Sequence, residues 1–322
     1  MNDDTRIISL VSPSGIDPQI LTFVEKTSAH FAALSGGHSV SINRRREIAE
    51  AVREPWVRGG PVMGHSQTYT IGPDALRVRV HIPKSGAGNG TLYYLHGGGW
   101  VMFSVDTHDR LMREYADRAG CAVVGLDYSL SPEHRFPRAL DDIDLCMRWL
   151  LTEGENLGLN INRIVLGGDS AGGNLSLATA MRMRDRGEDL PSGLLLNYAA
   201  LDTDERPSYG LYDGDPYMLG ASEMKAFWRD YLGSDQTKDP YARPLLGNLE
   251  GLPPVHLCIA ECDILVDENR ELRSRLLDAG GSVSAIEYSG ATHSFLEAVG
   301  ISSCADRAIS ESSVWITGIL SA

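Results

Sequence analysis

Cysteine is scarce in this sequence, and its spacing suggests no pairing. The 322 residues include five cysteines, and no two of them form a Cys-x-x-Cys pair. An odd number of scattered thiols in so long a chain argues against a disulfide framework, which is typical of small secreted domains. We therefore expect reduced thiols and a cytoplasmic protein.

Long apolar runs are missing as well. No stretch approaches the ~20 apolar residues that a membrane-spanning helix needs. The first residues, Met-Asn-Asp-Asp at 1–4, lack the basic segment followed by an apolar one that marks a secretory signal. These two absences predict a soluble protein without a membrane span.

Positive charge is in deficit. The sequence has 29 Lys and Arg against 43 Asp and Glu, which gives a formal net charge of −14 at pH 7. Such a field repels phosphates over most of the surface, so we expect no nucleic-acid partner. The one basic cluster, Arg-Arg-Arg at 44–46, lies in a predicted helix over 42–52 and is interpreted as a solvated face. No glycine-rich phosphate loop ending in Lys and no zinc-ligand spacing is found, so we expect no cofactor and no metal.

What the sequence does contain is a serine flanked by glycines between a strand and a helix. The run Gly-Asp-Ser-Ala-Gly-Gly at 168–173 follows the mostly apolar run Arg-Ile-Val-Leu-Gly at 163–167 and precedes a helix-forming stretch at 174–186. This is the context of a Gly-x-Ser-x-Gly nucleophile elbow. Glycines suit the positions two residues either side of the serine, because a Cβ there would be crowded. Ser170 is therefore the candidate nucleophile.

A run of consecutive glycines lies upstream of this serine. The predicted buried strand 91–95 leads directly into His-Gly-Gly-Gly-Trp at 96–100. A loop that is merely flexible would not need a strand, a histidine and a tryptophan around it. Backbone N–H groups that point at one spot can stabilise a tetrahedral oxyanion, and glycine lets an acyl group come close. We predict an oxyanion hole formed by the N–H groups of Gly97, Gly98 and Ala171.

An acid and a base follow downstream in the order that this elbow requires. Asp263 comes after the predicted strand 255–260, and His293 comes after the predicted strand 282–288. The ends of parallel strands meet at one edge of a sheet, so loops distant in sequence converge there. We predict that Ser170 attacks, that His293 takes its proton, and that Asp263 orients the imidazole.

Other acids and histidines are candidates for these roles. Asp267 and Glu268 lie at the start of a predicted helix, where acids favour the helix dipole, and Glu261 precedes Asp263. The remaining candidate bases lie in a strand, in the glycine loop or before the serine in the chain. They are His256, His96, His81, His108 and His134.

These motifs together resemble the hormone-sensitive-lipase family of α/β-hydrolases. The likeness rests on His-Gly-Gly-Gly, on Gly-Asp-Ser-Ala-Gly-Gly, and on the segments 127–137 and 263–268, and it extends from about Gly64 to the C-terminus. The chain departs from the family pattern at Ile264, where proline is usual, and at Ser294 and Phe103, where glycine is usual. Phe103 is expected to reshape the substrate pocket. The candidate substrate-binding residues are Phe103, Tyr198 and Ile264.

Strands and helices alternate from about 69 to 288, which predicts βαβ units. The expected fold is an α/β-hydrolase fold, with a mostly parallel central sheet of about eight strands, helices on both faces and a helical cap. Two stretches break the alternation and are interpreted as cap: 1–60, and an insertion at 202–245 that separates the core segments 61–201 and 246–322. The insertion contains a predicted helix with Ser222 as N-cap, whose aromatic residues Phe227, Trp228 and Tyr231 are expected to pack on the main domain.

The function expected from these residues is hydrolysis of a small-molecule ester by a serine carboxylesterase. Short, acetyl-like acyl chains are what the family resemblance implies. An amidase or deacetylase could use the same triad, and a non-catalytic small-molecule-binding protein of the same fold is a third hypothesis. An edge strand such as 282–288, the opposite edge or the cap could form a homodimer.

Overall fold

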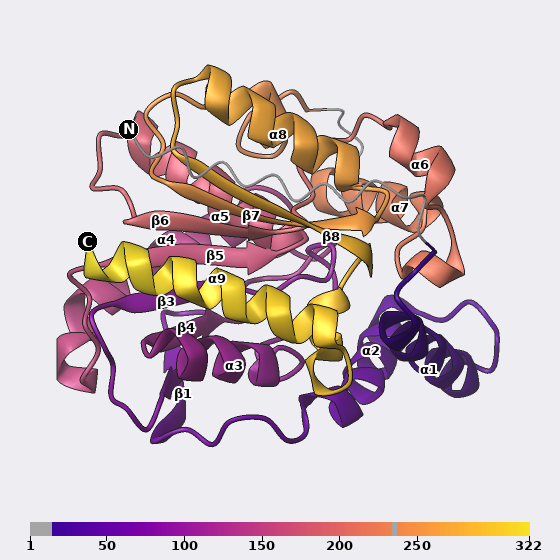
Figure 1. Cartoon of the computed structure of the whole chain (residues 1–322), viewed down its shortest axis with the longest axis horizontal. Helices are drawn as coiled ribbons and strands as arrows, with labels where there is room; N and C mark the ends of the chain where they lie inside the picture. The colour runs from indigo at the N-terminus through magenta and orange to yellow at the C-terminus, as the bar shows by residue number, and fades with distance from the viewer. Residues whose placement is uncertain (1–14, 234–236) are drawn as a thin grey trace.

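The computed structural model describes residues 15–233 and 237–322, and its centre is one twisted sheet (Figure 1). The strand order is β1-β2-β4-β3-β5-β6-β7-β8. Strand β2 runs antiparallel to both of its neighbours, β1 and β4, and the other pairs are parallel. The strands are β1 (His65–Ile71), β2 (Leu76–Ile82), β3 (Thr91–Leu95), β4 (Ala122–Leu126), β5 (Ile164–Asp169), β6 (Gly193–Asn197), β7 (Val255–Cys262) and β8 (Val283–Thr292).

Helices cover both faces of this sheet. In Figure 1, α3 and α9 lie in front of the strands, and α4 and α5 lie behind them. Side chains alternate along β3, so Tyr93 packs in the core on the side of α4, α5 and α8, and Tyr94 packs on the side of α3 and α9. The helices are α1 (Pro18–Ser35), α2 (Ile42–Val57), α3 (Asp109–Ala119), α4 (Arg138–Glu153), α5 (Ala171–Asp185), α6 (Pro207–Leu211), α7 (Ala221–Leu232), α8 (Val266–Asp278) and α9 (Ser303–Ser321).

The predicted fold class is confirmed, down to the number of strands. The predicted strand 91–95 has the observed bounds. Other elements are longer than predicted: β8 continues to Thr292 and so delivers His293 at its end. The helix after the elbow begins at Ala171.

The prediction of Ser222 as an N-cap is wrong. Helix α7 begins at Ala221, and its N-cap position is Gly220, which has no capping side chain. The cap comes from farther back, because the carboxylate of Asp213 accepts the N–H of Ala221 at 2.7 Å. A capping side chain outside the helix satisfies the same orphan donor as a local one.

The interpretation of Arg44-Arg45-Arg46 as a solvated face is also wrong for two of the three side chains. Arg46 donates to the carbonyl oxygens of Val101 and Ser131 at 2.8 Å each, and it pairs with Glu133 at 2.7 Å. Arg45 pairs with Glu223 of α7. Helix α2 packs against the body of the protein, so only one position of the run faces water.

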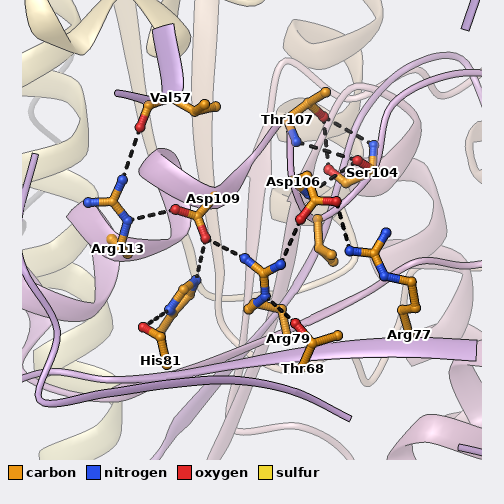
Figure 2. A network of polar contacts seen from close by, with 12 residues as sticks. Val57, Thr68, Arg77, Arg79, His81, Ser104, Asp106, Thr107, Asp109 and Arg113 are labelled. Carbon is orange, nitrogen blue, oxygen red and sulfur yellow. Dashed lines mark hydrogen bonds and ion pairs between the residues drawn. The ribbon is translucent and has the colours of Figure 1, made fainter. Parts of the chain in front are cut away.

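A polar network fixes the C-terminal end of α2 to α3 and β2 (Figure 2). Asp109 is its centre: one carboxylate oxygen accepts from Arg79 at 2.6 Å and lies 3.2 Å from Nε2 of His81, and the other accepts from Arg113 at 2.8 Å. Arg113 also donates to the carbonyl oxygen of Val57 at 3.0 Å. Charge-assisted hydrogen bonds of this length are strong, so the end of α2 is held firmly against α3.

The predicted segments 1–60, 61–201, 202–245 and 246–322 stay a prediction as a division into cap and core. Residues 1–14 of the first segment lie outside the described residues. The predicted absence of a secretory signal concerns these residues and stays a prediction. Strand β8 lies at one edge of the sheet, as expected, and a homodimer through it stays a prediction. None of the helices within 15–233 and 237–322 combines the length and apolar character needed to cross a membrane.

Candidate active site

Ser170 stands on a strained turn between β5 and α5. Its backbone has φ 53° and ψ −117°, a conformation that few residues other than glycine adopt. The turn is pressed against the end of β3: a Cβ on Gly168 or Gly172 would lie 2.3 or 1.9 Å from the carbonyl oxygen of Leu95. The N–H of Ser170 donates to the carbonyl oxygen of Asn197 at 2.9 Å. Packing and hydrogen bonding therefore hold the serine at the top of the sheet.

The structure brings Ser170, His293 and Asp263 into one hydrogen-bonded chain. Nε2 of His293 lies 3.0 Å from Oγ of Ser170, and Nδ1 lies 2.7 Å from Oδ2 of Asp263. The other carboxylate oxygen of Asp263 accepts the N–H of Leu265 at 3.0 Å. With its Nδ1–H donated to Asp263, the imidazole presents the lone pair of Nε2 to the serine hydroxyl, which is the arrangement that a general base needs.

The pKa of His293 is raised above its usual value of 6.5. Burial alone would lower it, but the charge of Asp263 and its hydrogen bond outweigh burial, and Asp169 and Glu223 add to the effect. The imidazolium that forms when Ser170 gives up its proton is therefore stabilised.

The prediction of Gly97 as an oxyanion-hole donor is wrong. Its N–H donates to Oδ1 of Asp169 at 3.2 Å, and a Cβ at Gly97 would lie 2.3 Å from the other oxygen of that carboxylate. Gly98 and Gly99 instead line the cavity in front of Ser170. Within residues 15–233 and 237–322, their amides donate to no protein acceptor. The candidate donors are therefore Gly98, Gly99 and Ala171, the first residue of α5.

The carboxylate of Asp169 holds the glycine loop 97–99 in place through a hydrogen bond from Gly97. Besides the N–H of Gly97, it accepts the hydroxyl of Tyr94 at 2.9 Å and lies 3.4 Å from Nε2 of His108. Burial would raise the pKa of Asp169, but the charge and hydrogen bond of His108 outweigh it and lower the pKa. Burial and the neighbouring His108 lower the pKa of His96 to about 3, so His96 is neutral and is a poor base.

A cavity of about 610 Å³ opens in front of the serine. Its walls come from α1, α2, the loop 98–103, the residues 215–227 and the turn that contains His293. Phe103, a candidate substrate-binding residue, lines it and has φ 72°, which fits a position where glycine is usual.

The other two candidate substrate-binding residues do not line this cavity in the part of the chain that the structure describes. Tyr198 lies beside His293, with its ring centroid 5.1 Å from the imidazole in an edge-on arrangement. Ile264 is fully buried in the core, and its carbonyl oxygen accepts the hydroxyl of Ser208 at 2.5 Å. Both predictions fail because side chains beside a triad residue can point into the core.

Four charged residues that line the cavity were not identified from the sequence: Arg45, Arg53, Asp215 and Glu223. The signal was available for α2, because Arg45, Ala49, Val52 and Arg53 share the spacing of one helix face. A helix face that combines arginines with small apolar residues indicates contact with the rest of the protein or with a cavity, and not with bulk water alone.

The competing acids and bases have other partners. Asp267 and Glu268 lie in the first turn of α8, as expected, but they also accept the N–H groups of Ser208 at 2.9 Å and Asp202 at 3.0 Å. His256 lies inside β7, where burial lowers its pKa to about 4. Within the described ranges, no three His, Cys, Asp or Glu side chains are grouped so that they could hold a metal ion.

Comparison with known proteins agrees with this geometry. Residues 92–297 match a family model of the alpha/beta hydrolase fold. A hyperthermophilic esterase from the archaeon Pyrobaculum calidifontis is 31% identical with a TM-score of 0.87, and the match covers 96% of this chain and 100% of the esterase. The thermostable carboxylesterase EstE1, cloned from a metagenomic library, is 29% identical with a TM-score of 0.83, over 87% of this chain and 98% of EstE1.

A further relative carries the family name that the motifs suggested. It is an esterase from the bacterial hormone-sensitive lipase family, 26% identical with a TM-score of 0.82, and the match covers 95% of this chain and 100% of that one. The family resemblance seen in the sequence is thereby confirmed. The chain belongs to the α/β-hydrolase fold family and, within it, to the carboxylic ester hydrolases of the bacterial hormone-sensitive lipase family.

Proposed function

We propose that the protein is a serine carboxylesterase that hydrolyses short-chain acyl esters through a covalent ester of Ser170. The observation that carries the proposal is the hydrogen-bonded chain from Ser170 through His293 to Asp263, at the wall of a cavity large enough for an ester. Nucleophile, base and orienting acid are all in contact before substrate arrives.

In the acylation step, Oγ of Ser170 attacks the ester carbonyl carbon, and its proton passes to Nε2 of His293. Asp263 stabilises the imidazolium that results. The negative charge that develops on the carbonyl oxygen is stabilised by the amides of Gly98, Gly99 and Ala171. The last of these stands at the N-terminus of α5, where the helix dipole also favours an anion. When the tetrahedral intermediate collapses, His293 returns the proton to the leaving alcohol.

In the deacylation step, water takes the place of the alcohol. His293 removes a proton from the water as it attacks the acyl carbon, and the same amides stabilise the second oxyanion. Collapse releases the carboxylic acid and restores the hydroxyl of Ser170.

The short acyl length is supported by the family likeness and by the composition of the cavity. Arg45, Arg53, Glu223 and His38 are among the lining residues. Burying a long alkyl chain against charged groups removes their solvation without replacing it, which is unfavourable. Short or polar acyl groups avoid that cost.

The test is steady-state hydrolysis of p-nitrophenyl esters from acetate to palmitate, with Ser170→Ala as the comparison. We expect the highest kcat/KM on short chains and a loss of about 10⁴-fold or more in the variant. A variant as active as the parent would overturn the role of Ser170, and a maximum on long chains would overturn the acyl length. Faster hydrolysis of matched anilides than of the esters would make the protein an amidase.

A further inference from the structure

Arg53 places a buried positive charge in the wall of the cavity. The residue lies near the C-terminal end of α2 and is only 7% exposed. Its Nε donates to a carboxylate oxygen of Glu297, which belongs to the short helical turn Phe295–Gly300 directly after His293. Arg53, Ser170 and His293 line the same cavity. The guanidinium therefore belongs to the space in which the substrate would react.

Two aromatic rings orient the guanidinium. Its central carbon lies 4.7 Å from the ring centroid of Phe103 and 6.0 Å from that of Phe23. At these distances the cation is attracted by the faces of the rings. The N–H groups of a guanidinium lie in one plane, so the ring contacts and the hydrogen bond to Glu297 together restrict the directions in which Arg53 donates.

Most of these N–H groups have no protein acceptor among the described residues. In residues 15–233 and 237–322, the guanidinium makes one hydrogen bond, from Nε to Glu297. A buried charged donor that stays unsatisfied is costly, so its remaining N–H groups require acceptors. The cavity that Arg53 lines is where such acceptors fit.

The charges around the cavity favour an uncharged acceptor over an anionic one. Arg53 is already paired with Glu297, and Arg45 is paired with Glu223. Burial raises the pKa of Glu223 and outweighs the opposing charges of Arg45, His293 and Arg53. An additional carboxylate would be repelled by both acids, whereas a carbonyl or ether oxygen would gain a charge-assisted hydrogen bond without that repulsion.

We propose that Arg53 forms a polar subsite for substrates, and that the preferred esters carry a second, uncharged acceptor oxygen such as a keto or ether oxygen. The inference rests on the proposed esterase function and narrows its substrate class. Arg53 acts as a binding residue: its Nη groups donate to the second oxygen while Ser170 attacks the ester carbonyl.

The experiment compares esters of equal length that differ in one oxygen. On the acyl side, p-nitrophenyl 4-oxopentanoate is compared with p-nitrophenyl pentanoate. On the alcohol side, 2-methoxyethyl acetate is compared with butyl acetate by titration of the released acid. Each kcat/KM is divided by the rate constant for hydroxide-catalysed hydrolysis, so that intrinsic reactivity cancels. A p-nitrophenyl monoester of adipic acid, compared with p-nitrophenyl hexanoate, tests an anionic second group.

Three variants separate the subsite from general stability. The double variant Arg53→Met with Glu297→Gln removes the guanidinium without leaving a buried carboxylate unpaired. Arg53→Lys keeps the charge beside Glu297 but loses the planar set of donors. This variant tests the subsite if the double variant does not fold. The matched control is Arg44→Met with Glu47→Gln, which removes an exposed ion pair from the same helix outside the cavity.

We expect the parent and the control to prefer the oxygen-bearing ester of at least one pair, and we expect the double variant to reduce that preference by about tenfold or more. Arg53→Lys should reduce it in the same direction. An unchanged preference in the folded variants, or a stronger preference of the parent for the carboxylate-bearing ester, would overturn the proposal. Pentanoate and butyl acetate report the esterase function independently, since a parent inactive on both would refute that function and not the subsite alone.

Discussion

Nδ1 of His293 lies 2.7 Å from Oδ2 of Asp263, although 30 residues separate the two in the chain. This contact outweighs the effect of burial and raises the pKa of the imidazole above 6.5. Because only the neutral imidazole can take the proton of Ser170, activity follows the deprotonated form. The pKa of His293 can therefore be read from the pH dependence of kcat/KM.

The first prediction is that kcat/KM rises with pH through an apparent pKa above 6.5, the value of a histidine in water. The measurement is the pH profile for a short p-nitrophenyl ester from pH 4.5 to 9, corrected for buffer hydrolysis. A profile with its highest rates at about pH 5 would be incompatible with His293 as the base.

The second prediction concerns Asp263→Asn. The amide keeps the size of the side chain but removes the charge, and its NH₂ group can force the proton of the imidazole onto Nε2, where it blocks proton transfer from Ser170. We expect kcat to fall by about 10⁴-fold, as it does for the same substitution in a serine protease triad. Glu261→Gln is the control, because the carboxylate of this neighbouring acid accepts hydrogen bonds from Ser289 and Gly290. A loss confined to KM would argue against an orienting role for Asp263.

The third prediction separates two effects of Asp169. Its charge helps to raise the pKa of His293, and its oxygen holds the N–H of Gly97. Asp169→Asn retains an acceptor for Gly97 but removes the charge, so the pKa of His293 falls and the acid limb of the pH profile moves to lower pH. Asp169→Ala removes both, and we expect it to lower kcat by a further factor of about ten or more as the oxyanion loop loosens. If the two variants had the same kcat and an unshifted limb, Asp169 would have no positioning role.

The sequence predicted the parts of the site that follow from strand ends and missed those that follow from side-chain direction. Ser170, Asp263 and His293 could be found because a parallel sheet gathers its loops at one edge. Gly97 was misassigned because the direction of its N–H depends on a buried carboxylate, which only the folded chain reveals.

Side-chain direction also explains why the residues that line the cavity were not predicted correctly. Ile264 and Tyr198 neighbour triad or strand-end positions in the chain, yet their side chains pack in the core. Arg53 has no motif around it, and it reaches the cavity because α2 crosses the site. Helix-face spacing could have indicated this orientation, but which element the face meets is a tertiary property.

The fourth prediction tests the anchoring of α2. Arg46 makes hydrogen bonds to Val101 and Ser131 and an ion pair with Glu133, whereas Arg44 pairs with Glu47 on the surface. We expect Arg46→Met to lower the free energy of unfolding by about 1–3 kcal/mol, because two carbonyl oxygens and a carboxylate lose a charged donor. Arg44→Met should change it by less than about 0.5 kcal/mol. Chemical denaturation followed by circular dichroism gives both values, and equal effects would mean that α2 is not held through Arg46.

The last prediction concerns acid stability and the network of Figure 2. Burial would raise the pKa of Asp109, but its hydrogen bonds to His81 and Arg113, together with their charges, lower it below its usual range. A carboxyl group with a lowered pKa in the folded state stabilises that state at every pH above its unfolded-state value of about 4. The stabilisation is lost as the pH falls from there toward the pKa in the folded state.

Asp109→Asn should therefore lower the free energy of unfolding by about 1–3 kcal/mol at pH 7, since the hydrogen bonds it weakens are charge-assisted. The gap between variant and parent should narrow below about pH 4, where the unfolded parent takes up the proton that the variant cannot bind. Urea denaturation at pH 7, 5 and 3 measures this gap. Asp74→Asn is the matched control, because Asp74 pairs with Arg138 at an exposed site, where ion pairs contribute little. A gap that stays constant down to pH 3 would show that Asp109 acts through packing and not through its charge.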